Sequence, residues 1–258
     1  MTLVLLHSAG ETPAVWDDVR AHLKGIPVLA PPLPGRAGAG APADTVAAHA
    51  DAVLDAMDHA GLARATIAGH SLGGAVALWL ALEQPGRVAG LGLVSTGARM
   101  RVNPAALAAL PDGLADAAPL MAAANFPAGT DPSLIERRRS AYESVGGATL
   151  LADLTACDRF DVLDRLWEIR CRTQALVGAE DALTPPRYMK LLAERISAAR
   201  YVEYPNTGHM LPLERPAEVA GELAVLWAAS LEGRVSRKRG SSSLRSGDRG
   251  AGSPLPVD

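Results

Sequence analysis

The fold of this chain is decided by the stretch Gly69-His70-Ser71-Leu72-Gly73-Gly74, which fits the pattern Gly-x-Ser-x-Gly. The apolar run 65–68 before it predicts a buried strand, and the apolar residues 73–84 after it predict a helix. A serine between such a strand and helix lies on a sharp, strained turn above the sheet. The flanking glycines lack a Cβ atom, which allows the strand and the helix to approach closely. Free N–H groups at the helix N-terminus would favour negative charge there, so Ser71 is the predicted nucleophile.

Strands and helices alternate along the rest of the chain. Short apolar runs predict strands at residues 3–6, 27–30, 91–95, 174–178 and 200–204, and helical periodicity predicts helices at 44–60, 187–196 and after Pro216. This alternation predicts a parallel sheet with helices on both faces. The interval 97–172 has no clear buried strand but has helical patches at 103–109 and 132–144. We therefore expect a core formed by residues 1–96 and 173–232 and a helical cap formed by residues 97–172.

Charge is distributed unevenly over the 258 residues. Six basic and two acidic residues give residues 233–258 a charge of +4, so the formal net charge of −3 leaves −7 for the rest. A mildly acidic body has no field suited to nucleic acid. The end of the chain is rich in Ser, Gly, Arg and Pro and has few large apolar residues, so we expect residues 233–258 to form a disordered basic tail.

The sequence also bounds the compartment and the cofactors. Cys157 and Cys171 are too few for a disulfide framework, and both are predicted to be reduced. No charged segment precedes the apolar run 3–6 as in a signal peptide, and the longest apolar stretch, 72–82, is too short to span a bilayer. Histidines and carboxylates show no metal-binding spacing. We expect a cytoplasmic protein with no membrane span, no metal and no cofactor, in an oligomeric state that the sequence leaves open.

A serine hydroxyl needs a base, and two loops supply candidates for the base and for the acid that orients it. Asp181 follows the predicted strand 174–178, and His209 follows the predicted strand 200–204. Sites on open α/β sheets gather at such carboxyl ends of strands. We predict that His209 takes the proton from Ser71 and that Asp181 orients the imidazole, with Glu180 as the weaker candidate for the acid. Three further histidines are expected to lie on helices facing solvent and are given no chemistry: His22, His49 and His59.

The tetrahedral intermediate of acyl transfer requires backbone N–H donors. The N–H of Leu72, directly after the predicted nucleophile, is one candidate. The N–H of Ala9, in the loop that follows the first predicted strand, is the other. Ser8, His70 and Met210 adjoin the predicted site residues in sequence, and we assign them to the substrate pocket.

Several motifs resemble the α/β-hydrolase superfamily, in the same order and over residues 3 to about 231. They are Leu3-Val4-Leu5-Leu6-His7, Trp16, Pro32-Leu33-Pro34-Gly35-Arg36, Gly69–Gly74, Gly178…Asp181 and Gly208-His209. The resemblance implies the chain order serine, acid, histidine, and a helical cap that roofs the pocket. It also implies a serine carboxylesterase acting on a small-molecule ester, with lactone or thioester cleavage as close variants.

Three positions narrow the subfamily that the chain resembles. Ser71 argues against haloalkane dehalogenases and epoxide hydrolases, whose nucleophile is an aspartate. Met210 stands where hydroxynitrile lyases typically carry a lysine, and it therefore favours ester hydrolysis. Ser8 stands where most members have glycine, and its hydroxyl either contacts substrate or only occupies the loop. The apolar, alanine-rich composition of the cap favours a small, largely apolar substrate.

The resemblance leaves other readings open. Most members have two more strands before the one that starts here at Leu3, so we expect about six parallel strands with the first hairpin missing, by nature or by trimming. A cofactor-free perhydrolase or haloperoxidase and a carbon–carbon bond hydrolase are alternative enzyme classes on the same fold. A ligand receptor or signalling partner that turns over very slowly is the non-enzymatic alternative.

Overall fold

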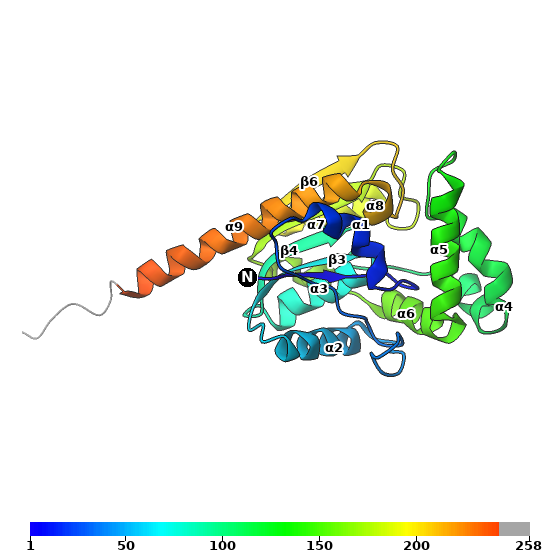
Figure 1. Cartoon of the computed structure of the whole chain (residues 1–258), viewed down its shortest axis with the longest axis horizontal. Helices are drawn as coiled ribbons and strands as arrows, with labels where there is room; N and C mark the ends of the chain where they lie inside the picture. Colours follow the sequence, from blue (N-terminus) through cyan, green and yellow to red (C-terminus); the bar gives the residue numbers. More distant parts are fainter. Residues whose placement is uncertain (243–258) are drawn as a thin grey trace, which may run out of the picture.

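A parallel sheet forms the centre of the computed structural model, which describes residues 1–242 (Figure 1). Its strands are β1 (Leu3–Leu6), β2 (Val28–Leu29), β3 (Ala65–His70), β4 (Val88–Val94), β5 (Arg172–Gly178) and β6 (Ala199–Tyr204). Within the described residues they form one six-stranded sheet in the order β2-β1-β3-β4-β5-β6, and every neighbouring pair is parallel. The predicted α/β fold with about six parallel strands is confirmed.

Helices cover both faces of the sheet. One face carries α2 (Val46–His59), α3 (Leu72–Glu83) and α7 (Pro186–Arg195), and the other carries α1 (Asp17–His22) and α9 (Pro216–Ser242). A 3-10 helix, η1 (Pro13–Trp16), precedes α1, and the short α8 (Leu211–Glu214) precedes α9. Thr45 caps α2, because its Oγ1 accepts a hydrogen bond from the Ala48 N–H at 3.3 Å.

The central strands bury both of their faces. Val4 and Leu6 pack in the cluster with α2 and α3, whereas Leu3 and Leu5 pack in the cluster with α1 and α9. This division follows from the period of two along a strand. All four side chains of β1 are completely buried. The sequence of β1 is therefore continuously apolar and does not alternate between apolar and polar residues.

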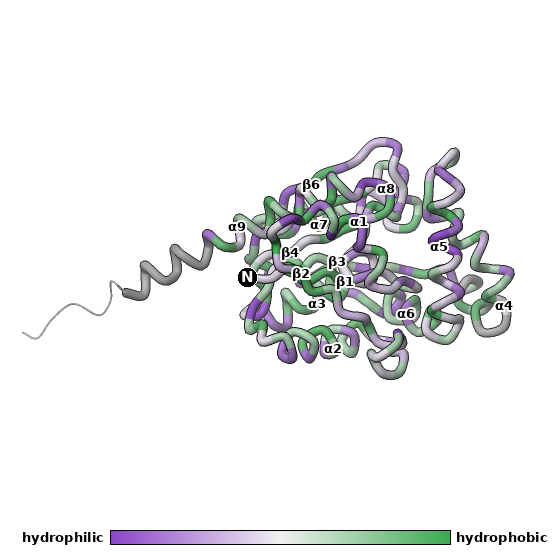
Figure 2. Tube along the Cα trace, viewed as in Figure 1, coloured by the Kyte–Doolittle hydropathy of each residue, from purple (hydrophilic) through white to green (hydrophobic). Residues whose placement is uncertain are grey.

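Three helices and a 3-10 helix lie between β4 and β5, and we call this segment the insertion. They are α4 (Pro104–Ala123), α5 (Pro132–Val145), α6 (Gly147–Arg159) and η2 (Leu163–Glu168). Asn103 and Asp131 cap α4 and α5 with side-chain oxygens that accept backbone N–H groups at 2.9 Å. The helices α4 and α5 lie beyond the carboxyl ends of the strands (Figure 1). The helix α5 is largely hydrophilic, whereas β3, β4 and α3 are hydrophobic (Figure 2). The assignment of this segment as a separate cap domain stays a prediction.

The last helix is longer than the sequence patterns predict. This helix, α9, continues to Ser242, into the range where we predicted a disordered tail, and the tail assignment stays a prediction. Arginine and lysine, which are frequent there, are good helix formers, and their charge is favourable near a helix C-terminus. The rest of the predicted tail, residues 243–258, lies outside the described residues.

His49 also differs from expectation, because it is completely buried rather than facing solvent. It lies on the same face of α2 as Val46 and Val53, which point into the core. Its Nε2 contacts the main-chain oxygen of Ala43 at 3.0 Å and lies 3.7 Å from an Asp153 carboxylate oxygen. Burial lowers the pKa of His49, so this histidine is a neutral core residue near neutral pH.

Cys157 and Cys171 are both free thiols in the structure. Burial raises the pKa of each, so both are protonated near neutral pH. In residues 1–242, no helix combines the length and the hydropathy needed to cross a bilayer. The location of the protein in the cell stays a prediction.

Candidate active site

Ser71 lies between the end of β3 and the start of α3 with φ 53° and ψ −114°. A positive φ is strained for a residue that carries a Cβ atom, and such strain gathers at functional positions. A Cβ atom on Gly69 would collide with the Gly73 carbonyl, and one on Gly73 would collide with the Leu6 carbonyl. The two glycines therefore permit the close approach of β3, α3 and β1 that produces this turn.

Asp181 and His209 lie in contact. Asp181 follows β5, and His209 lies in the loop between β6 and α8. His209 Nδ1 is 2.9 Å from Asp181 Oδ2 and 3.1 Å from Asp181 Oδ1, and both side chains are almost completely buried. Glu180, the weaker candidate for the acid, is exposed. The structure thus brings Asp181, and not Glu180, to the histidine ring.

Donors from the following turn hold the Asp181 carboxylate. Oδ1 accepts from the N–H groups of Leu183 at 2.9 Å and Thr184 at 2.8 Å, and Oδ2 accepts from the Thr184 hydroxyl at 2.8 Å. Burial alone would raise the pKa of Asp181, but His209 and these hydrogen bonds hold the pKa below its ordinary value. The ionised carboxylate accepts the proton on His209 Nδ1. In the neutral imidazole, Nε2 is then the ring nitrogen without a proton, which is the nitrogen that can act as a base.

Hydrogen bonds also fix the main chain around His209. Glu214 accepts from the N–H groups of the residues on either side of it, at 2.8 Å and 3.0 Å. The His209 N–H donates to the Asn125 carbonyl at 2.8 Å, which ties the loop to the insertion. His70 Nε2 lies 2.8 Å from the His209 carbonyl oxygen. Burial lowers the pKa of His70 well below its ordinary value, so the ring is neutral and donates from Nε2.

Ser71 and His209 lie at the same end of the sheet. His70, directly before Ser71, contacts the main chain of His209, so the serine turn and the histidine loop adjoin. Within the described residues, Ser71 Oγ makes no hydrogen bond to the His209 ring. Catalytic hydrogen bonds often form only when substrate is bound. The contact between the predicted nucleophile and the predicted base stays a prediction.

The predicted donors and pocket residues are placed as follows. Leu72 is the first residue of α3, where backbone N–H groups have no partner within the helix, and Ala9 lies in the buried loop after β1. Ser8 is buried, and its hydroxyl has no hydrogen-bond partner in the described part of the chain. His70 and Met210 are completely buried, and Met210 packs in the core cluster with α1 and α9. Neither side chain lines an open surface, and the donor and pocket roles stay predictions.

Sequence reasoning missed three residues that support this site: Thr184, Glu214 and Asn125. Thr184 lies three residues after Asp181, a spacing at which a hydroxyl commonly closes a turn onto a carboxylate, and this pattern could have indicated it. Glu214 lies one turn after the histidine loop that it holds. Asn125 uses its backbone carbonyl, which no side-chain pattern can indicate.

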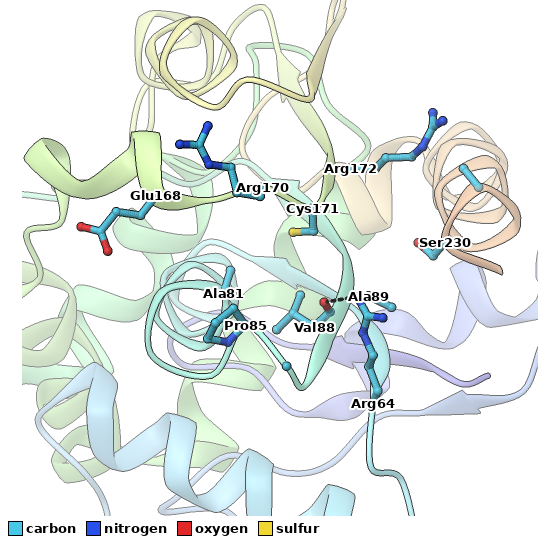
Figure 3. A pocket seen from close by; sticks show the side chains of 12 residues that line it. Arg64, Ala81, Pro85, Val88, Ala89, Glu168, Arg170, Cys171, Arg172 and Ser230 are labelled. Atoms are coloured by element: carbon cyan, nitrogen blue, oxygen red, sulfur yellow. Dashed lines mark hydrogen bonds between the residues drawn. The ribbon is translucent and has the colours of Figure 1, made fainter. Parts of the chain in front are cut away.

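A cavity of about 400 Å³ lies at the opposite end of the sheet (Figure 3). Its lining includes Val88 and Arg172, the first residues of β4 and β5, together with Cys171 and Ser230. These are the amino ends of the strands, whereas Ser71 follows the carboxyl end of β3. The cavity is therefore not part of this site. Among the side chains that the structure describes, no group of three or more histidine, cysteine or carboxylate residues could hold a metal ion.

Comparison with known proteins agrees with the observed fold. The model of the alpha/beta hydrolase family matches residues 3–222. Pimeloyl-[acyl-carrier protein] methyl ester esterase of Aromatoleum aromaticum is 33% identical over 242 residues, which cover 84% of this chain and 94% of the relative. A solved esterase from Thermogutta terrifontis has a TM-score of 0.81 at 27% identity and covers 89% of this chain and 90% of its own. The enol-lactonase from Burkholderia xenovorans LB400 has a TM-score of 0.82 at 24% identity, covers 87% of this chain and 90% of its own, and shares the fold. Because the family model matches most of its length, this chain belongs to the alpha/beta hydrolase family.

Proposed function

We propose that this protein is a carboxylic ester hydrolase in which Ser71 is the nucleophile, His209 the base and Asp181 the acid that orients His209. The observation that carries the proposal is the buried pair of Asp181 and His209, 2.9 Å apart, at the same end of the sheet as the strained turn of Ser71. The esterase relatives support the reaction class.

The reaction proceeds in two balanced steps. Ser71 Oγ attacks the ester carbonyl carbon while its proton passes to His209 Nε2, which gives a tetrahedral oxyanion. The carbon–oxygen bond to the alcohol then breaks, and the alcohol leaves with the proton from His209. Water attacks the resulting acyl-serine in the same way, and the carboxylic acid leaves as Ser71 regains its proton. Asp181 stays ionised throughout and stabilises the imidazolium.

Two backbone donors stabilise the oxyanion in this proposal. The N–H of Leu72 lies at the start of α3, where the helix dipole also favours negative charge. The N–H of Ala9 approaches from the loop after β1, which parallel pairing places beside β3. Each donor of this kind contributes about 10²–10³-fold to the rate in other serine hydrolases.

The substrate we propose is an ester of a small alcohol. The relative from Aromatoleum is named a methyl ester esterase, which supports a small leaving group. The apolar composition of the insertion gives weaker support for an apolar acyl group. Leu110 and Leu150 are completely buried and pack the helices of the insertion together. Leu120, in contrast, is exposed.

Hydrolysis of a series of short p-nitrophenyl esters tests the proposal, with wild type compared to Ser71→Ala. We expect rapid release of p-nitrophenol by the wild type and a fall of about 10³-fold or more in the variant. Asp181→Asn gives a second test. Its activity should fall, because an asparagine amide can hold the wrong tautomer of His209. Glu180→Gln is the matched control next to it, and it should retain full activity because Glu180 is exposed.

Three outcomes would contradict the proposal. Equal turnover in wild type and Ser71→Ala would show that Ser71 is not the nucleophile. Activity lost in Glu180→Gln but kept in Asp181→Asn would show that Glu180, and not Asp181, is the acid that orients His209. A folded wild type that neither hydrolyses these esters nor forms an acyl-serine detectable by mass spectrometry would exclude a general esterase.

A further inference from the structure

The loop that carries Ala9 is held by a charged side chain of the insertion. Arg138 of α5 donates to the Ala9 carbonyl at 2.9 Å and to the Gly10 carbonyl at 3.2 Å. The same guanidinium pairs with the Glu11 carboxylate at 2.7 Å. Arg138 is only 3% exposed, and sequence reasoning gave it no role. Three consecutive residues of the loop are therefore anchored to one buried cation.

The guanidinium of Arg138 has no donor left for a ligand. Its Nε–H donates to Asn125 Oδ1 at 3.4 Å, and one terminal N–H donates to the Tyr142 hydroxyl at 2.8 Å. The group also lies over the Tyr142 ring, 3.9 Å from the centroid. Together with the three contacts to the loop, these bonds use all five N–H groups. Arg138 is built to hold the protein chain rather than a substrate anion.

Asp153 of α6 holds the same loop from the other side. Its Oδ2 accepts from the Gly10 N–H at 2.8 Å, and its carboxylate pairs with Arg36 at 2.8 Å and 2.5 Å. The Asp153 side chain is completely buried. The peptide between Ala9 and Gly10 is thus bonded at both ends, at its carbonyl by Arg138 and at its N–H by Asp153. Because a peptide is planar, these two bonds fix its orientation.

The preceding peptide, between Ser8 and Ala9, is fixed by its carbonyl. Ser8 O accepts from the Glu11 N–H at 3.2 Å and lies 3.0 Å from His7 Nδ1. His7 Nε2 accepts from a backbone N–H, so the proton is on Nδ1 and is donated to Ser8 O. In a trans peptide the N–H points away from the carbonyl. The Ala9 N–H is therefore held in one direction, opposite to Ser8 O.

We propose that Arg138 and Asp153 are positioning residues for the Ala9 N–H. They fix the adjoining Ala9–Gly10 peptide, and Arg138 also holds Glu11, whose N–H bonds Ser8 O, so that the Ala9 N–H keeps the direction that the oxyanion requires. This inference rests on the proposed roles of Ser71 and Ala9. Its physical basis is that a donor aimed in advance needs no reorganisation when charge develops on the substrate. The insertion then supports the chemistry through its buried charges as well as by covering the site. A displacement of about 1 Å in such a donor costs about 10²-fold in rate.

The test uses the full chain with Arg138→Met and Arg138→Lys, and Arg139→Met as the matched control on the next position of α5. Among the described residues, Arg139 pairs with Glu136 and Glu143 of its own helix, and it is partly exposed. The readouts are kcat and KM for a p-nitrophenyl ester, and the inhibition constant of a trifluoromethyl ketone that forms a tetrahedral oxyanion with serine. We expect kcat to fall about 10–10²-fold in Arg138→Met, with KM changed less than about threefold. The inhibition constant should rise in parallel with the loss in kcat/KM, and Arg139→Met should match the wild type.

Asp153→Asn keeps the proposal testable if Arg138→Met does not fold, because it fills the same space but replaces the charged acceptor of the Gly10 N–H by a neutral one. We expect kcat to fall with KM little changed, and wild-type kcat in a folded Asp153→Asn would overturn the proposal. Arg138→Lys keeps the charge but cannot reach both carbonyls, and it should fall between wild type and Arg138→Met. A folded Arg138 variant with wild-type kcat and wild-type inhibition would overturn the proposal, and so would a rise confined to KM.

Amide hydrogen exchange separates this inference from the proposed function. If the wild type hydrolyses no ester, the exchange rates of the Ala9 and Gly10 amides still report on the anchoring. Faster exchange at Gly10 in Arg138→Lys, with Arg139→Met unchanged, would support the positioning role. Equal exchange in all three proteins would overturn it, whatever the fate of the esterase proposal.

Discussion

Thr184→Val probes the contacts that hold the predicted acid and base together. The Thr184 hydroxyl donates to Asp181 Oδ2 at 2.8 Å and lies 3.2 Å from His209 Nδ1. The hydroxyl has one proton, which goes to the carboxylate, so towards the ring it can only accept. Valine has nearly the same shape, and the substitution therefore removes these polar contacts without opening a cavity.

The size of the effect follows from what remains after the change. Asp181 Oδ2 keeps His209 as a partner, and Oδ1 keeps two backbone N–H groups, so no carboxylate oxygen is left without a bond. A hydrogen bond to a charged group contributes about 1.5–3 kcal/mol, and we expect the lower half of that range. The loss raises the pKa of Asp181, and a free energy of about 1.4 kcal/mol corresponds to about tenfold in a rate. The expected fall in kcat/KM near neutral pH is about tenfold.

The dependence of the unfolding free energy on pH shows whether the Asp181 carboxylate is the cause of the effect. The folded state lowers the pKa of Asp181 below its ordinary value of 3.8, so this group adds stability above that value and loses it as the pH falls through the folded pKa. The difference in unfolding free energy between wild type and Thr184→Val should therefore be largest near neutral pH and shrink in acid. Urea unfolding at several pH values measures it. Thr184→Ser keeps the hydroxyl and should resemble the wild type. A serine variant as weak as the valine variant would show that keeping the hydroxyl does not preserve the effect, and it would refute the reasoning.

Substitutions to and from glycine test backbone strain. Ser71→Gly should be about 1 kcal/mol more stable than Ser71→Ala in urea unfolding, because glycine relieves the positive φ of 53° and its greater chain entropy offsets only part of this gain. A less stable glycine variant would argue against strain at the turn. Gly10→Ala should cost about 2–4 kcal/mol, because φ is +63° and the new Cβ atom would lie 2.5 Å from the Tyr142 ring. Gly38→Ala, with a similar φ and open space, should cost only about 1 kcal/mol, and an equal cost at both sites would exclude the clash.

Much of the fold could be predicted because each central strand is buried on both faces. The runs at 3–6 and 174–178 are strands in the structure within one or two residues at each end. The helix α6 (Gly147–Arg159) was missed, because its buried face mixes Leu150 with the polar Thr149 and Asp153. His49 was placed in solvent by residue type, although its spacing from Val46 and Val53 is that of the buried face of α2.

The candidate site likewise has residues that local sequence patterns indicate and residues that they do not. Ser71, Asp181 and His209 each follow a strand, so local patterns indicated them, and the structure brings Asp181 to His209. Most residues that hold these groups in place have no local signal, and Thr184, three residues after Asp181, is the exception. Arg138 lies 127 residues from Glu11, and charged residues on a helix are usually solvated. Residue type does not distinguish Arg138 from its partly exposed neighbour Arg139.

Two buried ion pairs connect the insertion to the loops that contain Glu11 and Arg36, and the signs of the charges are reversed between the two pairs. In one pair the insertion supplies the cation, Arg138, to Glu11, and in the other it supplies the anion, Asp153, to Arg36. Removing one partner of a buried pair costs about 3–5 kcal/mol, because the other charge is left uncompensated. Replacing both partners of one pair, as in Glu11→Leu with Arg138→Met, should recover much of that stability.

The same double replacement should not recover activity, because the Ala9 and Gly10 carbonyls would still lack the donors that Arg138 supplies. Stability and catalysis would then separate in one variant, which a purely structural role for the pair would not allow. Thermal unfolding and kcat, measured on both single variants and on the double variant, decide between the two roles. If kcat returned together with stability, the pair would serve the fold alone, and the orientation of the Ala9 N–H would not depend on Arg138.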